Sequence, residues 1–406
     1  MDISQIVVHD LRTGIQRVSR AVLYESFHCS QLSSFRVEPV YSMKSKDSLL
    51  PYASSKSTGT AARTCYGYAR KYTSQFLGVG DSWAVDGPIT FSSGDVFFGL
   101  DWAADKVPGM ANALADMRDS GVRVFFFVHD ILPISHPEWF PPEMEGIGTS
   151  WLQAVSAVSD GLICNSRATA RAVFEWMDTA DIFRQRPLRI GYCHPGADLE
   201  PSIPTVGLPS SFEAIFPALA KSTTFLMVGT LEPRKGHEQV LDAFEMLWEE
   251  GYEADLIIAG KAGWMVDDVI NRIRSHGELG KHLFWFNDVS DEALERLYRS
   301  ASCLVAASFD EGFGLPLIEA ARMGLPVIAR DIPVFREIAG DGALYFDGLS
   351  PSELVSAVKR WLGLHEAGEA PSPNDISYSS WADVTSIIAE MFADESHANW
   401  LYEWKK

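Results

Sequence analysis

The chain has 406 residues, of which 47% are hydrophobic, and a formal net charge of −20. This length exceeds the usual single hydrophobic core and predicts two domains, while the acidity argues against a nucleic-acid partner. The apolar runs are far shorter than the ~20 residues that span a bilayer. The five cysteines are scattered without a CxxC spacing, which argues against a zinc site or disulfide framework and favours a cytoplasmic location.

Short apolar runs alternate with helical patterns along the chain, which is typical of parallel sheets built from βαβ units. The first run, 3–9, lacks the cationic flank of a signal peptide and is predicted to be the first strand. Further strands of the first half are expected at 36–41, 95–100, 122–128, 161–165 and 188–193.

The pair Thr13-Gly14 follows the first expected strand and precedes a helix expected to begin near Gln16. Gly14 has no side chain, so a diphosphate can approach this backbone closely. Arg17 adds positive charge at the same place. The turn is therefore a candidate phosphate contact.

The segment 36–71 reverses the charge of the rest of the chain. It holds seven lysines and arginines against two acids, with four tyrosines among them and a fifth, Tyr72, directly after it. One interpretation is a solvated loop. The other is a patch that meets an anionic membrane and a lipid-linked acceptor, since tyrosine has an apolar body and a polar tip.

His129 and Asp130 end the most hydrophobic strand of the first half, so both are expected at the carboxyl edge of the sheet, where ligands of such sheets bind. A histidine bonded to a neighbouring loop is the alternative. His136 and His194 each lie beside a proline, which favours a structural role for both.

A stretch rich in Pro, Ser and Gly, 201–211, has linker composition and separates the two predicted domains. A second break lies at 366–373, and 381–392 is predicted to be a helix. Strands of the second half are expected at 223–230, 254–260, 283–286, 302–306, 326–329 and 343–346.

Arg234 and Lys235 follow the strand 223–230 through a proline-containing turn, which places them at the carboxyl edge of the second sheet. Two adjacent cations can neutralise a diphosphate and stabilise it as a leaving group. The alternative is a solvated start of a helix.

The segment 308–319 places Glu311 in a turn and Glu319 on the helix that follows. Pro316 marks the start of this helix and Gly324 its end. A helix N-terminus favours negative charge, and carboxylates accept hydrogen bonds from hydroxyls. The pattern suits a sugar nucleotide, although a turn acid and a surface acid are the alternative for the two glutamates.

Glu311 and Glu319 match the E-x7-E motif, and the chain resembles the retaining, GT-B-fold glycosyltransferases of family GT4. Three further blocks agree with that family in order, at 225–236, 254–260 and 324–329. The N-terminal half is similar, more loosely, to a bacterial subset that builds surface polysaccharides, often with mannose.

The resemblance implies two Rossmann-like parallel-sheet domains that face a deep cleft. They comprise 1–203 on the acceptor side and 204–376 for the nucleotide sugar, with 377–406 returning to the first domain. It further implies sugar transfer with retention, from GDP-mannose as the best-matching donor to a lipid-linked oligosaccharide. The product is then O-antigen, capsule or exopolysaccharide, made at the inner face of the cytoplasmic membrane.

The family's residue roles carry over to matching positions. Glu311 and His129 are expected to orient the sugar, and Arg234 and Lys235 to stabilise the leaving group. The other expected donor contacts are Glu319, Gly312, Phe313, Gly314, Leu315, Gly14, Arg17 and Gly229. The chain lacks the Asp-x-Asp motif of metal-dependent GT-A enzymes, so no metal and no cofactor are expected.

Two alternatives remain open: a GT-B sugar-nucleotide epimerase or hydrolase that needs no acceptor, and a non-catalytic sugar-nucleotide-binding protein. A dinucleotide dehydrogenase is disfavoured because the chain contains no G-x-G-x-x-G fingerprint.

Overall fold

The computed structural model describes residues 1–8, 14–28, 36–43, 65–72, 87–180, 182–184, 186–198 and 222–405. The chain forms two compact units. The first unit comprises 1–134, 143–195 and 381–406, and the second comprises 135–142 and 196–380. The expected boundary at 203/204 lies outside the described residues.

The first unit contains a five-stranded sheet with the order β13-β6-β5-β4-β3. Its strands are β3 (Val96–Gly99), β4 (Arg123–Val128), β5 (Gly161–Cys164), β6 (Leu188–Tyr192) and β13 (Trp400–Trp404). Strands β3 to β6 are parallel, and β13 is antiparallel to β6. Four of these strands match the predicted runs, whereas β13 was not predicted.

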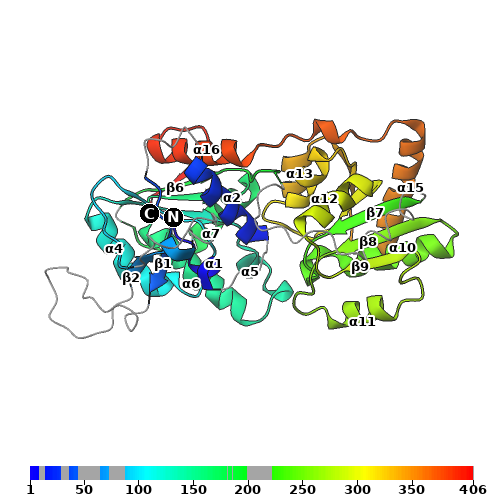
Figure 1. The fold of residues 1–406 in the computed structure, drawn as a ribbon, viewed down its shortest axis with the longest axis horizontal. Coiled ribbons are helices and arrows are strands. Elements are labelled where there is room, and N and C mark those ends of the chain that lie inside the picture. Colours follow the sequence, from blue (N-terminus) through cyan, green and yellow to red (C-terminus); the bar gives the residue numbers. More distant parts are fainter. Residues whose placement is uncertain are drawn as a thin grey trace. The chain divides into compact units, whose positions relative to one another are not determined.

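Helices cover this sheet on both faces (Figure 1). They are α2 (Gly14–His28), α4 (Ala111–Asp119), α5 (Leu132–Ser135), α6 (Glu143–Val158), α7 (Arg167–Thr179) and α16 (Trp381–Ala393), with a 3-10 turn at Val107–Met110. Helix α16 packs against α2, so the end of the chain completes the first unit. The core between strands and helices includes Phe126, Trp151 and Leu162.

The predicted strand at 3–9 is wrong, because the structure has a short helix there, α1 (Ser4–Val8). Asp2 starts this helix by accepting a hydrogen bond from the Ser4 backbone N–H at 2.9 Å. Asp101 accepts another from the Ile6 N–H at 2.7 Å. Side-chain acceptors thus satisfy the first-turn donors, which favours a helix over a strand of the same apolar residues.

The strand expected at 36–41 is displaced towards the C-terminus. The structure has β1 (Val40–Met43), paired antiparallel with β2 (Cys65–Tyr68) in a two-stranded sheet. Asp2 forms isolated β-bridges with Val40 of β1 and with Gly99 of β3. These bridges connect the two-stranded sheet to the edge of the five-stranded sheet.

The second unit contains a six-stranded parallel sheet with the order β12-β11-β10-β7-β8-β9. Its strands are β7 (Thr223–Val228), β8 (Ala254–Ala259), β9 (Leu283–Phe286), β10 (Cys303–Ala306), β11 (Val327–Arg330) and β12 (Ala343–Phe346), all close to their predicted positions. The strand order reverses between β7 and β10, as in a doubly wound sheet.

The helices of the second unit are α10 (His237–Glu249), α11 (Asp267–Ser275), α12 (Asp291–Ser300), α13 (Leu315–Arg322), α14 (Pro333–Ala339) and α15 (Pro351–Ala367), with 3-10 turns at Pro137–Trp139, Pro233–Lys235 and Pro373–Asp375. Local sequence determines several of their ends. Ser290 caps α12, and Ser350 with Glu353 forms a capping box on α15. The α/β prediction is confirmed for both units.

The segment 135–142 belongs to the second unit although its neighbours in sequence belong to the first. His136 stacks on Trp139, and Trp139 lies 6.0 Å from the ring of Phe309. The Trp264 indole donates to the Trp139 carbonyl at 2.9 Å. We call 135–142 the crossing segment.

Candidate functional site

The predicted site residues of the second unit lie at the switch point of its sheet. Arg234 and Lys235 follow β7, and Glu311 follows β10, the two strands between which the order reverses. Ligands of open α/β sheets bind outside the carboxyl ends of the strands at this point. The topology therefore brings together residues that are 76 or 77 positions apart in the sequence.

Glu311 lies between both predicted cations. Arg234 Nη1 donates to Glu311 Oε2 at 2.5 Å, and Lys235 Nζ donates to Glu311 Oε1. Arg234 Nη2 also donates to Glu232 Oε1 at 3.0 Å. The side chains of Arg234, Lys235 and Glu311 are only 13%, 12% and 9% exposed. We call Glu232, Arg234, Lys235 and Glu311 the ion cluster.

The ion cluster controls the charge of Glu311. Burial alone would raise the pKa of Glu311, but the charges of Arg234 and Lys235 outweigh it and hold this pKa at about 2. Glu311 is therefore ionised throughout the neutral range. Burial raises the pKa of Glu232, whose partner is Arg234. With two cations and two carboxylates, the cluster is close to neutral and can accommodate a further anion only by redistributing these bonds.

Glycines let the two site loops approach each other. Gly236 has φ 74°, and a Cβ there would lie 2.5 Å from the carbonyl oxygen of Ala307 in the neighbouring loop. Gly314 has φ 98°, and its Cβ would meet a ring carbon of Phe335 at 2.7 Å. A larger residue at Gly236 would push the two loops apart, and one at Gly314 would displace Phe335 of α14. Gly229 lies beside the Lys235 side chain, since its Cβ would be 3.4 Å from Lys235 Cε.

Glu319 lies on α13, the helix that begins directly after the Glu311 turn. It is 3% exposed and accepts a hydrogen bond at 2.7 Å from Tyr298 of α12. Of the other predicted donor contacts, Gly312, Phe313 and Gly314 are buried and Leu315 is half-buried. Tyr298 was missed from the sequence, because nothing in the spacing of 21 residues marks the two side chains as neighbours.

Of the site residues predicted in the first unit, His129 shares a carbonyl acceptor with Ser19 of α2. His129, directly after β4, bonds the Leu100 carbonyl through Nε2 at 3.0 Å. Ser19 of α2 donates to the same oxygen at 3.4 Å. Gly14 is the first residue of α2 and Arg17 lies on its first turn, while residues 9–13 lie outside the described residues. The carboxyl edge of this sheet thus meets the N-terminal half of α2.

His129 is a neutral donor in this setting. Its side chain is 4% exposed, and burial lowers its pKa to about 4, although the bond to Leu100 opposes this shift. Since a carbonyl only accepts, Nε2 carries the proton and Nδ1 is left as an acceptor. The expected contact of His129 with the transferred sugar stays a prediction.

The sequence profile described as "Glycosyl transferases group 1" matches residues 212–376, which lie in the second unit. By this match, the second unit is similar to the group 1 glycosyltransferases.

Two mannosyltransferases are similar to this chain in sequence. The serotype-specific mannosyltransferase WbdA of Escherichia coli is 41% identical over 394 residues, which are 96% of this chain and 44% of that protein. The O-antigen chain mannosyltransferase RfbU of Salmonella typhimurium is 34% identical over 139 residues, 34% of this chain and 38% of that protein. The chain spans less than half the length of these relatives.

Solved glycosyltransferase structures share the fold. Anabaena Alr3699/HepE in complex with UDP and glucose superposes with a TM-score of 0.56 at 16% identity, covering 74% of this chain and 78% of that chain. The sucrose-phosphate synthase of Thermosynechococcus elongatus superposes with a TM-score of 0.53 at 17% identity, covering 72% and 78%. The likeness shows the fold alone, which is the expected GT-B fold.

The crossing segment contacts the turn of the second unit that carries Glu311. His136 Nε2 lies 3.7 Å from Asp310 Oδ2, and its Nδ1 lies 3.2 Å from Glu138. Burial raises the pKa of Asp310, which also accepts the Glu311 N–H at 2.8 Å. The structural role expected for His136 thus includes support of the turn that carries Glu311.

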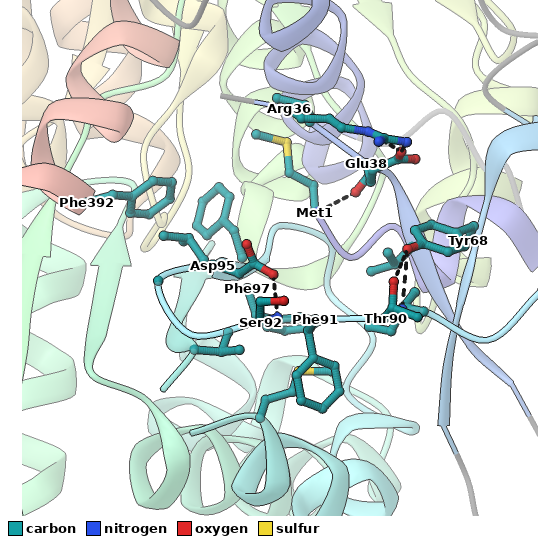
Figure 2. Close-up of a pocket in the computed structure, with 18 of the residues that line it drawn as sticks. Met1, Arg36, Glu38, Tyr68, Thr90, Phe91, Ser92, Asp95, Phe97 and Phe392 are labelled. Carbon is teal, nitrogen blue, oxygen red and sulfur yellow. Dashed lines mark hydrogen bonds and ion pairs between the residues drawn. The ribbon is translucent and has the colours of Figure 1, made fainter. Parts of the chain in front are cut away.

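A cavity of about 630 Å³ lies in the first unit, near the amino ends of β3 and β4. Asp95 and Val122, which precede these strands, line it together with Phe97 and Glu38 (Figure 2). His129 follows the carboxyl end of β4, so the cavity is at the opposite end of the strands. None of the described site residues predicted from the sequence is among its described lining residues.

The described ends of the basic segment 36–71 are partly neutralised. Arg36 and Arg70 both pair with Glu38, at 2.5 and 2.8 Å. Burial opposes the ionisation of Glu38, but the two arginines outweigh it and lower the pKa of its carboxyl. Residues 44–64 lie outside the described part of the chain, so the membrane interpretation stays a prediction.

Two features are absent from the described residues. No helix among them is both long and apolar enough to cross a bilayer. No cluster of three or more His, Cys, Asp or Glu side chains with the geometry of a metal site occurs within the same ranges.

Proposed function

We propose that this chain transfers mannose from GDP-mannose, with retention of configuration, onto a lipid-linked saccharide during the synthesis of a bacterial surface polysaccharide. The second unit holds the donor and the first unit the acceptor. The reaction takes place at the inner face of the cytoplasmic membrane and needs no metal.

The observation that carries the class of reaction is the position of the ion cluster at the switch point. Arg234 and Lys235 supply up to two positive charges where a diphosphate would lie, and Glu311 supplies a carboxylate for sugar hydroxyls. The choice of mannose and of a polysaccharide product is supported by the names of the relatives WbdA and RfbU.

The reaction then proceeds at the sugar carbon C1. The bond from C1 to the phosphate oxygen breaks, and its electron pair leaves with GDP, stabilised by Arg234 and Lys235. The acceptor hydroxyl oxygen bonds to C1 on the same face, and its proton passes to the departing phosphate oxygen. Glu311 orients the sugar, and Glu319 accepts hydrogen bonds from the ribose hydroxyls.

The proposal is tested by a product assay with GDP-mannose and a synthetic mannoside on a hydrophobic aglycone. We expect a lengthened mannoside with the anomeric configuration of the donor, as read by NMR. Free mannose or an epimer formed without acceptor would support the hydrolase or epimerase instead. Thermal shifts with GDP-, UDP-, ADP- and dTDP-sugars identify the base, since a ligand at 100 times Kd adds about 2.7 kcal/mol of stability.

Activity is expected to survive an excess of EDTA, because Arg234 and Lys235 take the role that a metal plays in other transferases. The assay compares initial rates with and without chelator, with a metal-dependent GT-A enzyme as the control. Loss of activity that magnesium or manganese restores would contradict the proposed role of the two cations.

We further expect the chain to bind vesicles that contain phosphatidylglycerol at low salt and to leave them at high salt. Each basic residue near an anionic surface is worth about 1 kcal/mol. Changing Lys44, Lys46, Lys56 and Lys71 to Glu should abolish co-sedimentation; Arg70 is kept because it pairs with Glu38.

A matched control changes four exposed cations of the second unit to Glu: Lys261, Lys281, Arg299 and Arg360. This control variant should still sediment with the vesicles. Equal sedimentation of both variants, or no binding of wild type at low salt, would show that the segment 36–71 is a solvated loop.

A further inference from the structure

Arg330, the last residue of β11, forms hydrogen bonds with three parts of the second unit: the turn at 307–308, Gly348 and Gln239. Its Nε donates to the carbonyls of Ala307 and Ser308, both at 3.1 Å, and its Nη2 donates to Ala307 at 3.0 Å. Nη1 donates to the carbonyl of Gly348, and Nη2 also donates to Gln239 Oε1. The residue is only 3% exposed.

The guanidinium lies between two aromatic rings. The Phe309 ring centroid is 4.7 Å from its carbon and the Phe346 centroid 5.0 Å. No carboxylate of the described residues forms an ion pair with Arg330; Asp347 and Glu353 act on it only at longer range. Carbonyl acceptors and aromatic rings therefore contact the buried guanidinium from several directions. These contacts hold the guanidinium in one orientation, and they restrict the movement of the groups that form them.

The residues that Arg330 contacts are themselves hydrogen-bonded to the ion cluster. Ser308, whose carbonyl binds Arg330, donates through Oγ to Glu311 Oε1 at 2.8 Å. The next residue, Phe309, stacks on Arg330 and donates its N–H to the Arg234 carbonyl at 2.7 Å. A shift of the turn 307–309 would therefore move both Glu311 and the backbone of Arg234.

We propose that Arg330 is a positioning residue for sugar transfer: it holds the turn 307–309 so that Glu311 and Arg234 keep the geometry the reaction needs. This inference rests on the proposed function, because it assigns a role within the same site. Arg330 lies behind the turn and acts through Ser308 and Phe309 rather than by contact with the sugar.

The planar fork of arginine explains why this residue type is needed. Its donors point in fixed directions and reach four acceptors at once, and its flat face fits between two rings. A lysine keeps the charge but has a single nitrogen with three donors. Arg330→Lys therefore removes the geometry while it retains the charge.

The test compares Arg330→Lys with Arg336→Lys. Arg336 is a matched control, because it also makes a forked bond, to Asp331, and lies 3.6 Å over the Tyr345 ring, but its side chain is 48% exposed. The experiment measures kcat, the KM for the donor, the Kd for GDP and the hydrogen–deuterium exchange of residues 307–314.

For Arg330→Lys we expect kcat to fall about tenfold to a hundredfold, as for other small displacements of catalytic groups. The Kd for GDP should change less than about threefold, since Glu319 is held independently by Tyr298, and exchange should rise within 307–314. Arg336→Lys should resemble wild type in all four readouts. An unchanged kcat for Arg330→Lys, or an equal loss of kcat, GDP affinity and exchange protection across the whole unit, would overturn the proposal.

If Arg330→Lys does not fold, Gln239→Met provides the second measurement, because it removes one acceptor of Arg330 while the residues of the turn remain. It should lower kcat in the same direction by a smaller factor, and an unchanged kcat would contradict the inference. Failure of the proposed function can be distinguished from failure of this inference. If the proposed function is wrong, wild type transfers no mannose. Hydrogen–deuterium exchange within 307–314 would still show whether Arg330 holds the turn.

Discussion

Arg234→Ala is expected to lower kcat/KM for the donor by about two to three orders of magnitude, the loss seen when a group that stabilises developing charge is removed. The reason lies in its bonds to both Glu311 and Glu232. Without Arg234, the leaving diphosphate loses one of its two cations, and Glu311 loses one of the two groups that orient it. Glu232 loses its ion partner, so its pKa, which burial already raises, should rise further.

Stability must be measured alongside activity, because removing one partner of a buried ion pair can cost about 3–5 kcal/mol of folding free energy. Circular dichroism melts and assays well below the Tm separate the two effects. Arg299→Ala is the control, since Arg299 forms an exposed pair with Glu295 on α12. A folded Arg234→Ala variant with kcat/KM within about threefold of wild type would show that the ion cluster is structural.

Glu319→Gln is expected to weaken donor binding by roughly tenfold to a hundredfold, because a charge-assisted hydrogen bond is worth about 1.5–3 kcal/mol. At saturating donor, kcat should change much less, whereas Glu311→Gln should lower kcat with a smaller effect on GDP affinity. The difference follows from position: Glu319 lies on α13 and is held by Tyr298, and Glu311 lies in the ion cluster.

Calorimetric titration with GDP and with GDP-mannose measures this split. Tyr298→Phe keeps the carboxylate of Glu319 but removes its hydrogen-bond donor, so we expect a weaker effect in the same direction. Glu295→Gln on the exposed pair of α12 is the control and should bind GDP like wild type. Identical effects of Glu319→Gln and Glu311→Gln on both quantities would refute the separate roles.

Local sequence predicted the strands of the second unit well, because each is a short apolar run that parallel sheets bury on both faces. Helix starts and stops were predictable for the same local reasons, such as Pro316 and Gly324 around α13. The same reasoning failed at 3–9, where the apolar pattern suits a strand but Asp2 and Asp101 supply acceptors for the first turn of a helix. One of those acceptors comes from a residue far along the chain.

By itself, the sequence determined which residue types stand at the carboxyl ends of β7 and β10, and so the candidates Arg234, Lys235, Glu311 and Glu319. Only the tertiary structure decided that Glu311 binds both cations, that Tyr298 holds Glu319, and that Arg330 holds the turn before Glu311. It also decided that the crossing segment packs with the second unit. The physical reason is that secondary structure follows from neighbours a few positions apart, whereas these contacts join side chains that the strand order brings together from 20 or more positions away.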